Sequence, residues 1–138
     1  MNVAFFLTPK SEVSFLYSDF TVRQGLEKMK QFGFTAVPVI DREGKYVSTV
    51  GEGDFLWYIL QDDAKRPEDT PLKDILKKDK NPPASITASA KDLINRAIGQ
   101  NFVPVTDDEG TFIGIVTRRD VIRNFAYSFD DGDLDTFK

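Results

Sequence analysis

A duplicated stretch constrains this chain more than any other feature. Residues 33–54 and 99–120 align without a gap, 66 positions apart, and nine of the 22 aligned positions are identical. The identities include a Val-Pro-Val triplet and the last aspartate, Asp54 in one copy and Asp120 in the other. Self-similarity of this kind indicates two copies of one supersecondary unit. We therefore divide the chain into a first repeat (1–60), a linker (61–71), a second repeat (72–127) and an acidic C-terminal tail (128–138).

Each copy has the pattern strand–helix–strand–strand–helix, which predicts a mixed α/β (α+β) fold. In the first copy, Thr21-Val22-Arg23-Gln24 is a capping box for a helix. Two strands follow at 36–40 and 46–50, joined by a polar turn that contains Gly44. The second helix is expected over residues 54–60, with Phe55, Leu56 and Ile59 facing the core.

Composition excludes several classes of function. The chain has no cysteine and no histidine, so disulfides, thiolate chemistry and the usual zinc ligand sets are excluded and no metal site is expected. The net charge of −4 gives no broad basic surface for nucleic acid. There is no apolar run of roughly 18 residues, so no membrane span is expected. The N-terminus does not resemble a signal peptide, and a cytoplasmic location follows as the default.

The stretch from Val103 to Asp120 carries the best candidate chemistry. It reads as strand, turn, strand and helix start, with Thr117 and Asp120 at the first turn of the helix. Free backbone N–H groups there favour an anion, and Arg118 and Arg119 add positive charge. A sugar-phosphate suits this set, although Thr117 and Asp120 are also spaced as a helix capping box and adjacent arginines are usually solvated. The same residues give no case for catalysis, because their spacing is explained equally well by binding.

These motifs, in their order and duplication, resemble the cystathionine-beta-synthase (CBS) domain family in its tandem arrangement, the Bateman module. The resemblance rests on the strand with Val-Pro-Val-x-Asp, the glycine turn, and the run from Gly114 to Asp120. It implies two repeats packed as a pseudo-two-fold sandwich with two clefts between the sheets. Such clefts commonly bind adenosine-containing ligands, and the modules often pair as flat dimers.

The resemblance also implies roles for individual residues. Asp120 would bind the ribose hydroxyls and Thr117 a phosphate oxygen, while Val103 and Pro104 would face the base. Thr87 would complete the polar wall or, equally well, cap the helix that follows it. The expected ligand-binding residues are Thr87, Val103, Pro104, Gly114, Ile115, Val116, Thr117, Arg118, Arg119 and Asp120.

The first copy departs from this pattern. Gly51 stands where the second copy has Thr117, and Glu52 stands where it has Arg118. The carboxylate of Asp54 is kept, but the hydroxyl is lost and an acidic group lies where phosphate would bind, which like-charge repulsion disfavours. We therefore expect one competent cleft. The residues of a possible second cleft are Thr21, Val37, Pro38, Val50 and Asp54.

The function expected from these features is that of a stand-alone regulatory module, not an enzyme. It would bind an adenine nucleotide (AMP, ADP or ATP) or a related adenosyl ligand as a regulatory ligand, use no cofactor, and signal occupancy to a protein partner. The alternative is a structural module for dimerisation or partner docking. A homodimer is expected through the helices that end each copy, whose apolar residues include Phe55, Trp57, Ile122, Phe125 and Tyr127.

Overall fold

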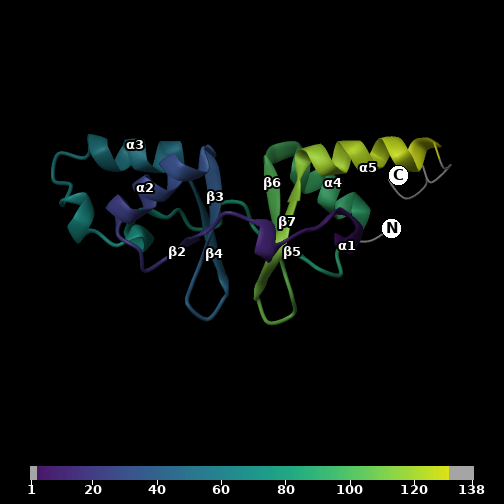
Figure 1. Cartoon of the computed structure of the whole chain (residues 1–138), viewed down its shortest axis with the longest axis horizontal. Coiled ribbons are helices and arrows are strands. Elements are labelled where there is room, and N and C mark those ends of the chain that lie inside the picture. The colour runs from purple at the N-terminus through teal and green to yellow at the C-terminus, as the bar shows by residue number, and fades with distance from the viewer. Residues whose placement is uncertain (1–2, 131–138) are drawn as a thin grey trace. The chain divides into compact units, whose positions relative to one another are not determined.

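The chain forms two compact units in the structure, a computed structural model that describes residues 3–130 and the side chains of residues 3–124 (Figure 1). The side chains of Phe125 and Tyr127, and the acidic tail from residue 131 onward, lie outside the described parts. Unit 2 is continuous, Ser14–Lys80, whereas unit 1 combines Met1–Val13 with Asn81–Lys138.

Unit 2 contains the first repeat. Its sheet has the order β2-β3-β4, with β2 parallel to β3 and β3 antiparallel to β4. Thr21 caps the first helix: its hydroxyl accepts from the Gln24 backbone N–H at 3.1 Å, and the Gln24 side chain accepts from the Thr21 backbone N–H at 2.8 Å. The predicted capping box is therefore confirmed. The elements of unit 2 are β2 (Leu16–Tyr17), α2 (Val22–Phe32), β3 (Ala36–Ile40), β4 (Tyr46–Gly51), α3 (Glu52–Leu60) and two 3₁₀ helices, η2 (Pro67–Asp69) and η3 (Leu72–Ile75).

Unit 1 contains the second repeat and an additional edge strand from the N-terminus. Its sheet has the order β1-β7-β6-β5, with β5 parallel to β6 and the other pairs antiparallel. The hydroxyl of Ser89 caps α4 by accepting from the Asp92 backbone N–H at 3.1 Å. The elements of unit 1 are α1 (Val3–Phe6), β1 (Thr8–Pro9), η1 (Lys10–Glu12), β5 (Ala84–Ser85), α4 (Ala90–Gly99), β6 (Phe102–Thr106), β7 (Phe112–Thr117) and α5 (Arg118–Asp130).

The two hairpin turns share a hydrogen-bond pattern, which explains why part of the sequence is repeated. In the β3–β4 turn, one carboxylate oxygen of Asp41 accepts from the backbone N–H groups of Glu43 and Lys45, at 3.0 and 2.9 Å. Asp107 repeats these bonds in the β6–β7 turn, at 2.9 and 3.0 Å. A side chain that bonds its own backbone fixes such a turn locally, so the aspartate is retained in both copies for structure.

The compact units do not coincide with the sequence repeats. Leu72 is fully buried in the core of unit 2, and its backbone N–H donates to the Phe20 carbonyl at 2.6 Å. At the other end of the chain, Val3 and Phe6 are buried in the core of unit 1, against residues of the second repeat. Each unit therefore consists of most of one repeat together with the first residues of the other repeat, and unit 2 also contains the linker.

The predicted strand–helix–strand–strand–helix order and the mixed α+β class are confirmed in both units. The orientation expected for Leu56 and Ile59 was wrong, because these side chains are 59% and 61% exposed. Phe55 and Tyr58, three positions apart on α3, already occupy the face toward the core. Leu56 and Ile59 fall about 100° around the helix from them, which directs both outward.

Candidate ligand site

The strongest candidate site lies in unit 1, where β7 ends and α5 begins. The hydroxyl of Thr117 accepts from the Asp120 backbone N–H at 3.0 Å, so Thr117 caps α5. The carboxylate of Asp120 is half-buried and accepts from the hydroxyl of Thr8 at 3.4 Å. An accepting hydroxyl still has its own O–H to donate, so Thr117 can serve as a cap and as a ligand group together. The capping alternative thus accounts for the Thr117 oxygen but not for the carboxylate of Asp120.

A row of residues across the sheet ends beside Thr117 and Asp120. Thr8 of β1 and Pro104 of β6 both lie opposite Ile115 of β7. Directly opposed residues share a face of the sheet, and Thr117 is two positions further along the same face. Thr8, Ile115 and Thr117 are partly exposed on this face beside Asp120, whereas Pro104 is buried. Sequence reasoning missed Thr8, because the N-terminal segment lies outside the duplicated stretch and no local motif marks it.

Gly114 allows the N-terminal strand to approach. Its φ is +156°, and a Cβ at this position would lie 2.2 Å from the carbonyl oxygen of Thr8. No side chain can be accommodated at that distance, and the backbone conformation is one that glycine adopts most readily. Gly114 contributes to the site by letting β1 bring Thr8 to Asp120.

The two arginines after Thr117 differ in their surroundings. The Nε of Arg118 donates to the carbonyl of Ala97 at 2.9 Å, and its Nη2 donates to that of Ile98 at 3.3 Å. A cation on the last carbonyls of a helix stabilises the C-terminus of that helix, here α4. Both arginines are exposed, but the Arg118 guanidinium is bonded to the end of α4, which makes Arg119 the better candidate for a ligand contact.

Four valines of the predicted clefts have their side chains in the cores. Val103 and Val116 are fully buried in unit 1, and Val37 and Val50 are buried in unit 2. Their side chains therefore pack the sheets against the helices. Only the backbone at these positions is available to a ligand.

The structure does not bring Thr87 together with Thr117. Ser85, at the end of β5, pairs with Thr106, whereas Thr117 pairs with Phe102 at the opposite end of β6. Four strand steps of about 3.3 Å separate those two ends. The hydroxyl of Thr87 is 2.8 Å from that of Ser85, and the helix that follows is capped by Ser89 instead.

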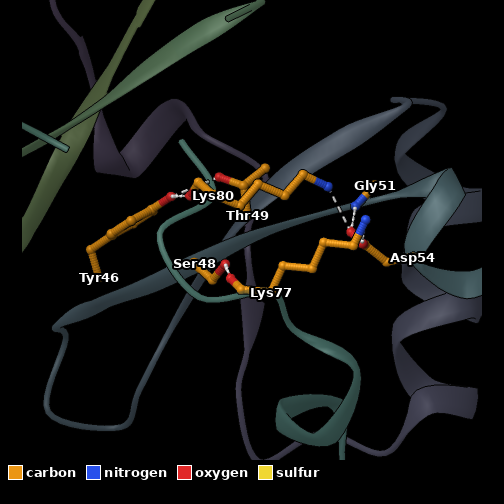
Figure 2. A network of polar contacts seen from close by, with 7 residues as sticks. All are labelled: Tyr46, Ser48, Thr49, Gly51, Asp54, Lys77 and Lys80. Atoms are coloured by element: carbon orange, nitrogen blue, oxygen red, sulfur yellow. Dashed lines mark hydrogen bonds and ion pairs between the residues drawn. The ribbon is translucent and has the colours of Figure 1, made fainter. Parts of the chain in front are cut away.

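The corresponding carboxylate of unit 2 has different neighbours. The Asp54 side chain is 1% exposed, and its Oδ2 accepts from the Gly51 backbone N–H at 2.8 Å and from Lys80 Nζ at 2.7 Å. Lys77 Nζ lies 3.8 Å from the other carboxylate oxygen. Asp54 is therefore ion-paired with lysines from the N-terminal part of the second repeat (Figure 2). Of the other residues predicted for this cleft, Thr21 caps α2 and Pro38 is buried in β3.

Hydroxyl groups on β4 hold the backbone that carries these lysines. Ser48 Oγ donates to the Lys77 carbonyl at 2.9 Å, and the Tyr46 hydroxyl donates to the Lys80 carbonyl at 3.3 Å (Figure 2). Burial raises the pKa of Tyr46 to about 12, so its hydroxyl remains a hydrogen-bond donor at neutral pH. Thr49 lies 2.8 Å from the same hydroxyl. We call residues Lys77–Lys80 the 77–80 segment.

Comparison with known proteins identifies the two repeats. The CBS domain family model matches residues 7–61 and again residues 67–127. The chain belongs to the CBS domain family. It is also similar to the inosine-5'-monophosphate dehydrogenase of Methanocaldococcus jannaschii, with 27% identity over 111 residues. That match covers 79% of this chain but 21% of the enzyme.

Solved structures of CBS proteins share the fold. The structure of CbpB in complex with c-di-AMP matches with a TM-score of 0.84 and 23% identity, covering 96% of this chain and 89% of that one. The structure of CBSX2 in complex with AMP matches with a TM-score of 0.77 and 24% identity, covering 94% and 98%. Within residues 3–130, no cluster of three or more Asp or Glu side chains could hold a metal ion. No helix in the described part of this CBS protein is long and apolar enough to cross a membrane.

Proposed function

We propose that this CBS protein is a regulatory module that binds an adenosine nucleotide at Thr117 and Asp120 of its second repeat and passes occupancy to a partner protein. The observation that carries the proposal is the half-buried Asp120 carboxylate at the start of α5, whose contact with the Thr8 hydroxyl is long, at 3.4 Å. A carboxylate so placed can accept hydrogen bonds from the two hydroxyls of a ribose. The complexes of CbpB with c-di-AMP and of CBSX2 with AMP support the ligand class.

The rest of the site fits a phosphorylated ligand. The macrodipole of α5 favours an anion at the start of this helix, and the exposed Arg119 adds positive charge there. The Thr117 O–H can donate to a phosphate oxygen. The partly exposed Ile115 offers apolar surface to a base, and the buried Pro104 lies opposite it on β6. We include Val103, Gly114 and Val116 through their backbone only, and leave out Thr87 and Arg118.

Ligand-dependent stability tests the proposal. AMP or c-di-AMP at 100 times its dissociation constant is expected to raise the free energy of unfolding by roughly 2.7 kcal/mol. Thermal unfolding with each nucleotide, and with GMP as the control, measures this shift. Calorimetry should give one site per chain for the bound nucleotide. The absence of any shift at millimolar AMP and c-di-AMP would contradict the proposal and favour a purely structural module.

Self-association is the second part of the proposal, and it rests on exposed apolar residues. Leu56 of α3 and Ile122 of α5 occupy equivalent positions of the two repeats, and their side chains are 59% and 64% exposed. An apolar position exposed in both copies indicates a shared interface. Next to it in unit 2 lies a groove of about 430 Å³. Apolar residues that line the groove are Leu26, Met29, Phe34, Phe55, Leu56 and Ile59.

We propose a homodimer through α3 and α5. Light scattering at micromolar concentration should therefore give twice the chain mass of 15.6 kDa. Leu56→Lys combined with Ile122→Lys should give the monomer, because burying two unpaired charges opposes association. Val47→Lys, on an apolar residue of β4 that is 43% exposed, is the control and should remain dimeric. A monomeric unmodified chain would contradict the dimer and leave the nucleotide proposal intact.

A further inference from the structure

The carboxylate of each repeat is contacted by a residue from the N-terminal part of the other repeat. Lys80 contacts Asp54, and Thr8 contacts Asp120. We propose that this contacting residue decides which repeat can take a ligand: Lys80 acts as an internal cation that closes Asp54, and Thr8 leaves Asp120 open. The inference builds on the proposed function, since the ligand in question is the same adenosine nucleotide.

The closed state of Asp54 follows from charge and burial. The Lys80 ammonium is 2.7 Å from Oδ2, and the Asp54 side chain is 1% exposed. Hydrogen bonds between two charged groups are shorter and stronger than those between neutral groups. A ribose would replace the ammonium with neutral hydroxyls and would separate Lys80, whose side chain is 31% exposed, from its buried partner. Loss of this ion pair costs free energy. Asp54 therefore keeps Lys80.

The open state of Asp120 follows from matched chemistry. Its partner is a neutral hydroxyl at 3.4 Å, a distance at the long end for a hydrogen bond between oxygen atoms. A ribose hydroxyl offers the same kind of donor as Thr8. Exchange of one for the other costs little, and a second ribose hydroxyl can occupy the remaining acceptor positions of the carboxylate. Asp120 is the carboxylate that a nucleotide can take.

The two copies differ at the positions that hold these segments. In β4, the side chains of Tyr46 and Ser48 donate to carbonyls of the 77–80 segment. The equivalent positions of β7 are Phe112 and Gly114, which have no hydroxyl. There the N-terminal segment pairs directly with the strand, as β1. The asymmetry is thus encoded on both sides of each contact, which argues against a chance placement of Lys80.

Exchanging the two contacting residues tests the inference. Lys80→Thr should open the first repeat, so that calorimetry with AMP or c-di-AMP gives two sites per chain in place of one. Thr8→Lys should weaken binding at the second repeat at least tenfold. The double exchange should keep one site but move it, so that Asp54→Asn now removes binding. Lys78→Thr, on an exposed neighbour in the 77–80 segment, is the matched control and should keep one site.

The outcomes separate this inference from the proposed function. If the unmodified chain binds one nucleotide and neither exchange changes the number of sites or the affinity, the inference is overturned and the function stands. Two sites in the unmodified chain also overturn it. If only the Lys80→Thr variant binds, the closing role of Lys80 stands, but the open state of Asp120 and the second-repeat site are both wrong. If neither the unmodified chain nor any variant binds either nucleotide, the inference and the proposed function are both overturned. Lys80→Arg keeps the cation and should keep the first repeat closed, and urea unfolding verifies that each variant is folded.

Discussion

Asp120→Asn is expected to weaken nucleotide binding by 10- to 150-fold while leaving the free energy of unfolding within about 0.5 kcal/mol of the parent. The binding loss follows because hydrogen bonds to a charged group contribute roughly 1.5–3 kcal/mol, and each 1.4 kcal/mol is about a factor of ten. Stability is retained because α5 is capped by the hydroxyl of Thr117, and asparagine keeps the size of the side chain. Calorimetry and urea unfolding on the same preparation measure the two quantities.

Asp54→Asn is the matched control, and it should give the opposite result. Removing one member of a buried ion pair destabilises by roughly 3–5 kcal/mol. Because Lys80 is 31% exposed, we expect a smaller loss of about 2 kcal/mol. Nucleotide binding should be unchanged. If Asp120→Asn bound the nucleotide as tightly as the parent, the carboxylate would have no role in binding and the proposed site would be wrong.

Gly114→Ala is expected to destabilise unit 1 by about 3 kcal/mol. The backbone conformation at φ +156° costs a residue with a side chain roughly 1–3 kcal/mol. The added Cβ would also lie 2.2 Å from the Thr8 carbonyl oxygen and 2.9 Å from Leu7 Cδ1. Backbone cannot move aside as a flexible side chain can, so β1 should separate from β7. Urea unfolding measures the loss, and hydrogen exchange at residues 8–9 should show the lost pairing.

Gly53→Ala provides the comparison for this glycine. It lies in α3, and a Cβ added there would point into open space. Alanine in a helix is more stable than glycine by roughly 0.5–1 kcal/mol, so this variant should be slightly stabilised. If Gly114→Ala unfolded with the same free energy as the parent, the close approach of β1 to β7 would be wrong.

Much of the fold was predictable from the duplication. Two copies aligned over 22 positions predict the same hairpin twice, and the Asp41 and Asp107 turns show why those positions are repeated. The helix preceding each hairpin was less certain. Ser89, and not Thr87, caps α4, because the second copy has two fewer positions between the helix cap and the first hairpin strand than the first copy has.

The candidate site was predictable only for residues inside the duplicated stretch. Thr117 and Asp120 were identified by their spacing at the start of a helix, a local pattern. Thr8 contacts Asp120 and Lys80 contacts Asp54, and both contacts join residues far apart in the sequence. These contacts depend on which segment of the chain packs against which sheet. Arg118 looked like a phosphate ligand from its charge, yet its position beside the end of α4 engages it with backbone carbonyls. The charge of a residue in the sequence does not show in which direction its side chain points in the fold.

The discontinuous construction of unit 1 also sets an order of assembly during synthesis. Residues 14–80 form a continuous unit, so unit 2 can fold as soon as Lys80 has left the ribosome. The first 13 residues are made earlier, but β1 has no partner until β7 is complete at Thr117. At roughly 5–20 residues per second, the intervening stretch takes seconds to synthesise. During that time the apolar side chains of Val3 and Phe6 cannot be buried in the core of unit 1. The N-terminal residues are therefore synthesised first but are among the last to pack.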